Sequence, residues 1–358
     1  MLRTVLHHVI TLCWTRKQVP TCWKRGSTIL IHKKGDTADP SNFRPITLQP
    51  VWYKIFSSVY GHRLHTWLKK TGSIDADLQK GFWPGVDGVA EHTEMLTNIM
   101  RDAKRHQRSL VVALLDLRNA FGEIHHELIR TALRAHHIPS EFLSLFDSIY
   151  FNYRLSISVN ETWTKPVTVE RGVLQGDPAS PLLFSVCFNL LMTTLNTPTY
   201  RSLGYTWGGG NKLRQRSWLQ FADDAAITAS DVKSAQALLN VFIPWCRWAG
   251  MDIWLDKCCV FGISKKHNDY VQILLVLWVD SKPVPTVGLD REFKYLGKIF
   301  SFKLDNKSAK NLIENKLQSF LAVISGLQIR PQYKIKILKQ FVYGQILFDI
   351  KIYDFSLD

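Results

Sequence analysis

The chain has 358 residues, 46% of them hydrophobic, which is enough apolar surface for a folded core and excludes an intrinsically disordered protein. A chain of this length predicts two or three subdomains. Lys and Arg outnumber Asp and Glu by 45 to 30. The net charge of +15 indicates a polyanionic partner, nucleic acid first and an anionic membrane second, although a basic soluble enzyme would show the same excess.

The cysteines and the apolar runs predict the compartment. None of the six cysteines forms a C-x-x-C pair or a zinc-finger pattern with histidine, so a reducing, intracellular environment is expected. The N-terminal stretch lacks the cleavage pattern of a signal peptide, and no apolar run reaches transmembrane length. We therefore expect a protein that is neither secreted nor membrane-bound.

The first half of the chain predicts helices that alternate with short strands. Ser27 to His32 predict a strand that is followed by a basic turn at residues 33–36. Apolar residues recur at helical spacing between positions 52 and 67, and residues 88–107 show a second amphipathic pattern. The continuous apolar run 110–115 is typical of a buried central strand. Another helix is expected from Ile124 to His136.

The second half adds a hairpin, a buried helix and further strands, so the fold class is mixed α+β. Residues 153–172 alternate apolar and polar side chains on both sides of Asn160 and Glu161, which predicts a hairpin. Residues 180–196 are apolar around most of a helix. The remaining expected elements are a strand–turn–strand over 217–230, a helix over 232–250, strands at Cys259–Phe261, Leu274–Val279 and Phe293–Ile299, and a basic helical tail.

Two adjacent aspartates, Asp223 and Asp224, lie at the expected turn between apolar strands. Two like charges repel, so they indicate either a solvated surface turn or a site that holds a cation. Asp116 comes directly after the buried strand 110–115, where it could also simply cap the next helix. Together, the three carboxylates would offer hard oxygen ligands for two Mg²⁺ ions about 3.5–4 Å apart, an arrangement that supports phosphoryl transfer.

A Gly- and Pro-rich loop, "RGVLQGDPASPLLF", precedes the predicted buried helix. Gly172 and Gly176 permit close backbone approach to a ligand, and the prolines stiffen the loop around Gln175. Taken alone it would be only a rigid loop. Next to an aspartate site it is suited to contact a template base and an incoming nucleotide.

Seven motifs in order resemble the reverse transcriptases of non-LTR (LINE-type) retrotransposons. They extend over roughly residues 23–299 and are "NFRPITL", "LQKGFWPGVDGVAEH", "LLDLRNAF", "RGVLQGDPASPLLF", "FADD", "GMDIWLDK" and "FKYLG". The resemblance implies a right-hand polymerase fold with an N-terminal helical extension (1–22), a fingers and palm domain (23–305) and a partial helical thumb (306–358). No endonuclease or further DNA-binding segment is found, so an isolated domain, a fragment or a decayed copy is expected.

The resemblance also implies roles for single residues. Asp116, Asp223 and Asp224 match the metal-binding aspartates, with Asp223 the stronger candidate for a direct ligand, and Lys257 matches a lysine that could act as general acid. The other expected positions are the Leu117 carbonyl as a further metal ligand, Phe121 as the steric gate against ribose, Arg44 on the triphosphate, Gln175 and Gly176 at the nucleotide and template, and Tyr295, Leu296 and Gly297 as primer grip. For Phe121 the alternative is a core residue, and for Arg44 and Lys257 it is a surface charge.

The implied activity is RNA-directed DNA polymerisation with two Mg²⁺ ions, for which Mn²⁺ could substitute. The expected partners are an RNA template, a DNA primer and dNTPs, inside a nuclear or cytoplasmic ribonucleoprotein. A catalytically silent RNA-binding remnant or scaffold is the alternative. An RNA-dependent RNA polymerase is a third hypothesis, but that class favours Gly before the aspartate pair and a small or polar gate, where this chain has Ala222 and Phe121.

Overall fold

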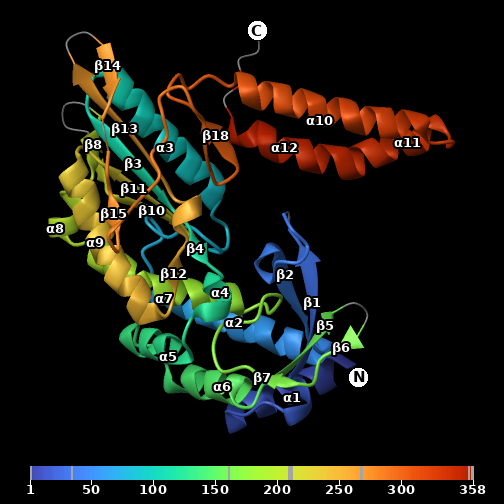
Figure 1. Cartoon of the computed structure of the whole chain (residues 1–358). Coiled ribbons are helices and arrows are strands. Elements are labelled where there is room, and N and C mark those ends of the chain that lie inside the picture. The colour runs from blue at the N-terminus through green and yellow to red at the C-terminus, as the bar shows by residue number, and fades with distance from the viewer. Residues whose placement is uncertain are drawn as a thin grey trace. The chain divides into compact units, whose positions relative to one another are not determined.

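A computed structural model describes residues 2–33, 35–159, 162–208, 213–266, 269–273, 275–353 and 355. The chain forms two compact units built from interleaved stretches (Figure 1). The first unit comprises Met1–Pro84, Leu117–Thr197 and Val241–Ile253, and the second comprises Gly85–Asp116, Pro198–Asn240 and Trp254–Asp358. This division does not test the predicted boundaries after residues 22 and 305, so those boundaries stay predictions.

The first unit contains a small mixed sheet. Strand β1 (Arg25–His32) pairs antiparallel with β2 (Phe43–Leu48), which sets Ile31 opposite Arg44. On its other side β1 runs parallel to β5 (Arg154–Val159), which pairs with β6 (Thr162–Trp163) and β7 (Val167–Thr168). The antiparallel β5–β6 pair confirms the predicted hairpin strands, whereas its expected turn at residues 160 and 161 lies outside the described residues.

Two helices dominate the core of the first unit. Helix α7 (Ser180–Leu195) is buried around most of its circumference, as predicted. Helix α2 (Val51–Thr71) ends at Gly72, whose φ of 63° allows its amide to reach the Leu68 carbonyl. The other elements are α1 (Leu2–Arg16), the 3₁₀ turns Thr21–Trp23 and Pro40–Asn42, β4 (Leu117–Arg118), α4 (Ala120–Glu123), α5 (His126–Ala135), α6 (Ser140–Tyr150) and β12 (Asp252–Ile253).

The second unit is built on a five-stranded antiparallel sheet of order β10-β11-β3-β13-β14. The central strand β3 (Leu110–Leu115) is buried along its whole length, which explains its continuous apolar sequence. On one side β3 pairs with β11 (Asp224–Ala229), which forms a hairpin with β10 (Trp218–Phe221). On the other side it pairs with β13 (Cys259–Lys266), and β14 (Asp269–Gln272) forms the edge.

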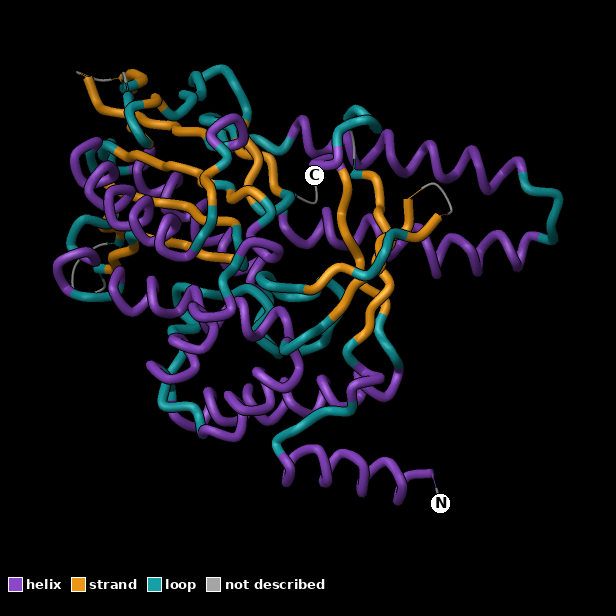
Figure 2. The backbone as a smooth tube through the Cα atoms, turned by 60° about the horizontal axis from the view of Figure 1, so that its bottom comes forward, coloured by secondary structure: helices purple, strands orange, loops and turns teal. Residues whose placement is uncertain are grey.

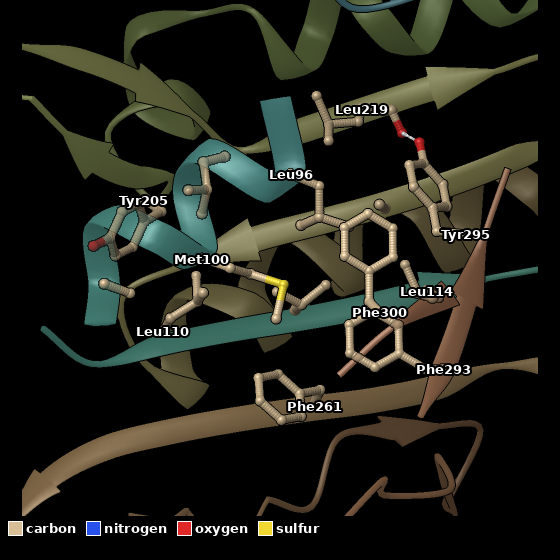
Figure 3. Close-up of a cluster of buried hydrophobic side chains, with 14 of the residues drawn as sticks. Leu96, Met100, Leu110, Leu114, Tyr205, Leu219, Phe261, Phe293, Tyr295 and Phe300 are labelled. Carbon is tan, nitrogen blue, oxygen red and sulfur yellow. Dashed lines mark hydrogen bonds between the residues drawn. The ribbon is translucent and has the colours of Figure 1, made fainter. Parts of the chain in front are cut away.

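Helix α3 (Gly88–Arg105) packs on this sheet through its apolar face. The Asp87 side chain accepts a hydrogen bond from the Ala90 amide and caps its first turn. Leu96 and Met100 lie in one buried cluster with residues of β3 and with aromatic side chains from the chain's last strands (Figure 3). Those strands are β17 (Phe293–Tyr295) and β18 (Lys298–Phe300), which form an antiparallel pair.

The C-terminal region is helical, as predicted. Helix α10 (Lys307–Gly326) lies antiparallel to the run formed by α11 (Pro331–Ile337), a π-helix (Leu338–Val342) and α12 (Tyr343–Ile352) (Figure 2). Ile324, Val342 and Ile346 form the buried contact between the two arms. The second unit also contains α8 (Pro198–Arg201), β8 (Tyr205–Trp207), β9 (Arg214–Arg216), the 3₁₀ turn Leu255–Lys257, β15 (Trp278–Val279) and β16 (Lys282–Pro283). Helix α9 (Val232–Ala249) belongs to the second unit up to Asn240 and to the first unit from Val241.

Two predicted strands are wrong in extent. In the predicted strand Leu274–Val279, residue 274 is outside the described residues and only Trp278–Val279 form a strand. Leu275, Leu277 and Val279 are buried by packing instead, and Leu275 fills the space above Gly262, whereas Val276 and Trp278 are exposed. The predicted strand Phe293–Ile299 is a hairpin that turns at Leu296 and Gly297, where both φ angles are positive, as a type I′ turn requires.

The cysteines and the helices can be compared with the sequence, while the predicted compartment stays a prediction. All six cysteines are free thiols. Within the described residues, no helix combines the length and the apolar character that crossing a membrane requires.

Candidate active site

The three predicted aspartates meet at one end of the sheet in the second unit. Leu115 of β3 pairs with Ala225 of β11, so the next residue on each strand, Asp116 and Asp224, continues the same register. Directly opposed residues of an antiparallel pair have Cβ atoms about 4.5–5.5 Å apart. Asp223 belongs to the two-residue turn that joins β10 to β11. Residues 107 positions apart in sequence (223 − 116) are therefore brought together by strand pairing alone.

The turn itself has an unusual backbone. Phe221 pairs with Asp224, which leaves Ala222 and Asp223 as its central residues. Ala222 has a φ of 54°, whereas Asp223 is absent from the positive-φ residues, and this combination is the type II′ pattern. The first central position of that turn favours glycine, because a Cβ there is strained. Ala222 thus holds a conformation that its own side chain disfavours.

Burial and like charges change the protonation of Asp224. Removal from water raises the pKa of this carboxyl to about 7, and the negative charges of Asp223 and Asp116 add to the effect. The positive charge of Lys257 opposes it. Burial and the repulsion between these carboxylates therefore disfavour the ionised form of Asp224 near neutral pH. A cation would relieve that repulsion.

Hydrogen bonds fix the backbone of Asp116 to the residues that flank the 3₁₀ turn Leu255–Lys257. Its amide donates a hydrogen bond to Cys258 Sγ at 3.4 Å, and its carbonyl accepts one from the Trp254 amide at 2.9 Å. Burial raises the pKa of the Cys258 thiol to about 12, so the sulfur remains a neutral partner. Lys257 is exposed and its Nζ lies 3.3 Å from the centre of the Trp254 ring. These contacts connect the predicted lysine to the aspartate end of the sheet.

The chemistry of these side chains fits a divalent metal. Among the residues that the structure describes, no three His, Cys, Asp or Glu side chains form a ready-made metal site. Asp116, Asp223 and Asp224 nevertheless offer hard carboxylate oxygens, which Mg²⁺ prefers. Burial and the charges of Asp223 and Asp116 raise the pKa of Asp224, and a divalent cation would oppose both effects. The donor set is therefore suited to Mg²⁺, and metal binding stays a prediction.

The predicted nucleotide residues of the first unit are joined through backbone hydrogen bonds. The Gln175 carbonyl accepts from the Thr47 amide of β2 at 2.7 Å, which ties its loop to the strand that carries Arg44. The same loop reaches α4, because the Val173 amide donates to the Phe121 carbonyl at 2.7 Å. Gly176 has a φ of 112°, and a Cβ there would lie 2.7 Å from the Thr47 carbonyl oxygen. Only glycine fits this position without a local shift.

A buried carboxylate that the sequence prediction missed anchors this loop. Asp177 accepts hydrogen bonds from the Ser57 hydroxyl of α2 and from the Ser180 hydroxyl, the latter at 3.1 Å. Burial raises the pKa of Asp177, and the two hydroxyls act in the opposite direction. Asp177 thus connects the loop to the start of α7 and to α2. Its only sequence signal is its place directly after Gly176.

The predicted gate residue Phe121 is half-buried on α4. Its ring stacks on the buried ring of Phe184 from α7, with centroids 4.3 Å apart and planes 8° apart. Phe82 contacts it edge-on at 5.7 Å. The packing holds the ring in one orientation, which a steric gate needs. Arg44 is exposed on β2, and both roles stay predictions.

The other predicted positions lie on turns and short strands. Leu117 belongs to β4 and pairs with Ile253 of β12. Tyr295 is buried, with its hydroxyl 3.5 Å from the Leu219 carbonyl, so its ring serves the core (Figure 3). Leu296 and Gly297, at the turn of the β17–β18 hairpin, are partly exposed. A primer contact at this motif would therefore involve the turn rather than the Tyr295 ring.

Comparison with solved structures identifies the fold. The structure resembles apo telomerase from Candida tropicalis with a TM-score of 0.52 at 11% identity, covering 90% of this chain and 58% of the other. A truncated form of telomerase from the same organism gives a TM-score of 0.51 and covers 83% of this chain. The predicted right-hand polymerase fold is confirmed.

The family follows from sequence. Residues 31–300 match the family described as reverse transcriptase (RNA-dependent DNA polymerase), and the chain belongs to this family. It is 26% identical over 333 residues to a Pol polyprotein of the R2 retrotransposable element from Nasonia vitripennis. It is 25% identical over 346 residues to the RNA-directed DNA polymerase from mobile element jockey of Drosophila melanogaster. The resemblance to non-LTR retrotransposon reverse transcriptases is thereby confirmed.

The chain is shorter than these relatives. The alignments cover 92% of the chain in both cases, but only 31% of the R2 polyprotein and 34% of the jockey polymerase. The chain therefore spans about a third of the length of the curated relatives that it matches.

Proposed function

We propose that this chain is an RNA-directed DNA polymerase that adds dNTPs to the 3′-hydroxyl of a DNA primer on an RNA template. One observation carries the proposal: strand register sets Asp116 beside Asp224, at the turn that holds Asp223, in a chain of the reverse transcriptase family. The R2 and jockey relatives favour a retrotransposon protein that acts in an intracellular ribonucleoprotein.

Asp116, Asp223 and Asp224 would hold two Mg²⁺ ions, or Mn²⁺ in their place, with the Leu117 carbonyl as a further ligand. Bound there, the ions would stabilise the attacking and leaving oxygens of an in-line phosphoryl displacement. Asp224 must lose its proton to act as a ligand, and its raised pKa means that metal and proton compete for this carboxylate. Lys257, whose charge reaches Asp224, is suited to donate a proton to the leaving pyrophosphate.

The first unit would select the nucleotide and contact the template. Phe121, stacked on Phe184, would exclude a ribose 2′-hydroxyl, and the exposed Arg44 would bind the triphosphate. Gln175 and Gly176 would contact the template and nucleotide, and the Leu296–Gly297 turn the primer. A net charge of +15 supports binding to phosphate backbones, and a telomerase of this fold was determined with a fragment of telomeric RNA.

Primer extension on an RNA template tests the proposal. The unmodified chain should incorporate dNTPs with Mg²⁺, whereas Asp223→Asn should lower the rate by about a thousandfold or more, because a metal ligand is lost. Asp280→Asn is the matched control, because this exposed aspartate lies outside the aspartate site, at the turn between β15 and β16. RNA binding without any extension by the unmodified chain would favour a silent RNA-binding scaffold instead.

The gate role has its own test. Phe121→Ala should increase rNTP incorporation relative to dNTP incorporation, because the smaller side chain leaves room for the 2′-hydroxyl. Equal discrimination by the variant and the unmodified chain would assign Phe121 to the core alone.

A further inference from the structure

A buried glutamine lies directly behind the aspartate turn. Gln220 of β10 has no exposed surface, and both ends of its side-chain amide are engaged. Its Oε1 accepts a hydrogen bond from Trp218 Nε1 at 2.7 Å, and its Nε2 donates one to the Ala222 carbonyl at 2.7 Å. Burying an amide costs free energy that only such hydrogen bonds offset. Here one of the two is made to the strained turn.

The backbone carbonyl of Gln220 is engaged as well. It lies 3.0 Å from Nε2 of the buried His92 on α3, within the same compact unit. Trp218 is also completely buried. Gln220 therefore has little freedom to move, and its hydrogen bond restricts the Ala222 carbonyl to one position.

The hydrogen bond to Ala222 acts on a residue that needs support. A non-glycine residue in the left-handed region costs about 1–2 kcal/mol. The Ala222 carbonyl and the Asp223 amide belong to one planar peptide unit. Holding the carbonyl therefore fixes the direction in which the chain enters Asp223, whose side chain is a predicted metal ligand.

We propose that Gln220 is a positioning residue for the polymerase reaction: its hydrogen bond holds the Ala222–Asp223 peptide in the orientation in which Asp223 can bind metal. The inference rests on the proposed function and adds a residue that the motif "FADD" does not include. It predicts that substitutions at positions 220 and 222 have coupled effects on metal binding, since the support from Gln220 matters only while residue 222 is strained.

The test measures Mn²⁺ binding by electron paramagnetic resonance and dNTP incorporation in parallel. Gln220→Met preserves side-chain length without hydrogen bonding. It should raise the dissociation constant for Mn²⁺ about tenfold and lower kcat with little change in the KM for dNTP. Against an Ala222→Gly background, the same substitution should change the dissociation constant by less than about threefold, since glycine adopts positive φ without strain.

Thr228→Val is the matched control. Thr228 is also completely buried in this hairpin, and its hydroxyl donates to the Arg216 carbonyl at 2.8 Å, away from the turn. The variant should lower the melting temperature as much as Gln220→Met does and leave Mn²⁺ binding unchanged.

The outcomes are distinguishable. Equal loss of Mn²⁺ affinity from Gln220→Met in both backgrounds, or none in either, would overturn the positioning role. Equal loss in Thr228→Val would also overturn it, because general loosening of the hairpin would then explain the result. A chain that binds Mn²⁺ with the predicted coupling but does not incorporate dNTPs would refute the polymerase proposal and leave the role of Gln220 in metal binding intact.

Discussion

Two short backbone segments carry predicted site residues, one in each compact unit, and they accommodate positive φ angles differently. In the first unit the position with a positive φ is Gly176, where the backbone approaches the Thr47 carbonyl too closely for any Cβ. In the second unit it is Ala222, whose strain is held by the buried amide of Gln220. Each segment is anchored by one buried polar side chain, Asp177 in the first and Gln220 in the second.

The difference concerns where the conformation is encoded. A glycine adopts its backbone angles at no steric cost, so the geometry at Gly176 depends on the absence of a side chain. The alanine turn depends on the hydrogen bond from Gln220, whose side chain is in turn held by the Trp218 indole. The first segment should therefore be disrupted by substitution of Gly176 itself, and the second by substitution of the residue that supports Ala222.

The largest effect is expected from Gly176→Ala. The added Cβ would overlap the Thr47 carbonyl, and the alanine would have to adopt a φ of 112°. The free energy of unfolding should therefore fall by about 3–5 kcal/mol in urea denaturation. Gly122→Ala is the control, because a Cβ at Gly122 meets no atom within 4 Å. Similar stability of both variants would show that the loop relaxes freely and that the contrast with the aspartate turn is unfounded.

A somewhat smaller loss is expected from Asp177→Ala. The change leaves the Ser57 and Ser180 hydroxyls without their buried acceptor and should cost about 2–3 kcal/mol in the same measurement. Asp177→Asn retains one acceptor oxygen and should recover part of this loss. If alanine and asparagine destabilise equally, the carboxylate does not anchor the loop.

The pH dependence of the aspartate turn is the third prediction. The pKa of Asp224 is raised to about 7 in the folded chain, so between about pH 4 and 7 the folded state keeps a proton that the unfolded state releases. Without metal, stability should therefore fall as pH rises through this window and then level off. At pH 8 and with a chelator, Asp224→Asn should be more stable by about 1–2 kcal/mol.

Thermal melts at several pH values measure this effect. Asp280→Asn serves as control and should keep the pH dependence of the unmodified chain. A pH profile that Asp224→Asn does not alter would place the charge repulsion elsewhere.

The smallest effect is expected from Ala222→Gly. Relief of the positive φ is worth about 1–2 kcal/mol, and the added freedom of the unfolded chain costs about 0.5–1 kcal/mol, so the net gain should lie between about 0 and 1.5 kcal/mol. Ala226→Gly, in the buried centre of β11, should instead lose about 1 kcal/mol or more. Equal losses at both positions would mean that Ala222 is not strained.

The sequence was most informative where side-chain pattern and backbone structure depend on the same physics. The apolar run 110–115 predicted a buried strand because both faces of β3 are covered, and its last residue is followed by Asp116. The two aspartates predicted a turn because apolar residues flank them on both sides, and these residues form β10 and β11. Antiparallel register then sufficed to bring these carboxylates together.

It was least informative where a role depends on contacts between distant segments. Gln220 looks like an ordinary polar residue in a strand, and nothing near it in sequence reveals that His92 lies 128 positions away and contacts it. Ala222 gives no local sign of a left-handed backbone, because alanine usually avoids it. The Tyr295 motif predicted a primer grip, and nothing in the motif reveals that the Tyr295 ring points into the core.

The aspartate turn has only two central residues, and this brevity limits how the chain can change. Successive side chains of a strand point to opposite faces, so one inserted residue between Phe221 and Asp224 would shift the pairing of β10 against β11 or force a bulge. A shifted register would exchange the Gln220 face of β10 with the face that packs in the core. Insertions and deletions should therefore be tolerated in this hairpin far less readily than substitutions.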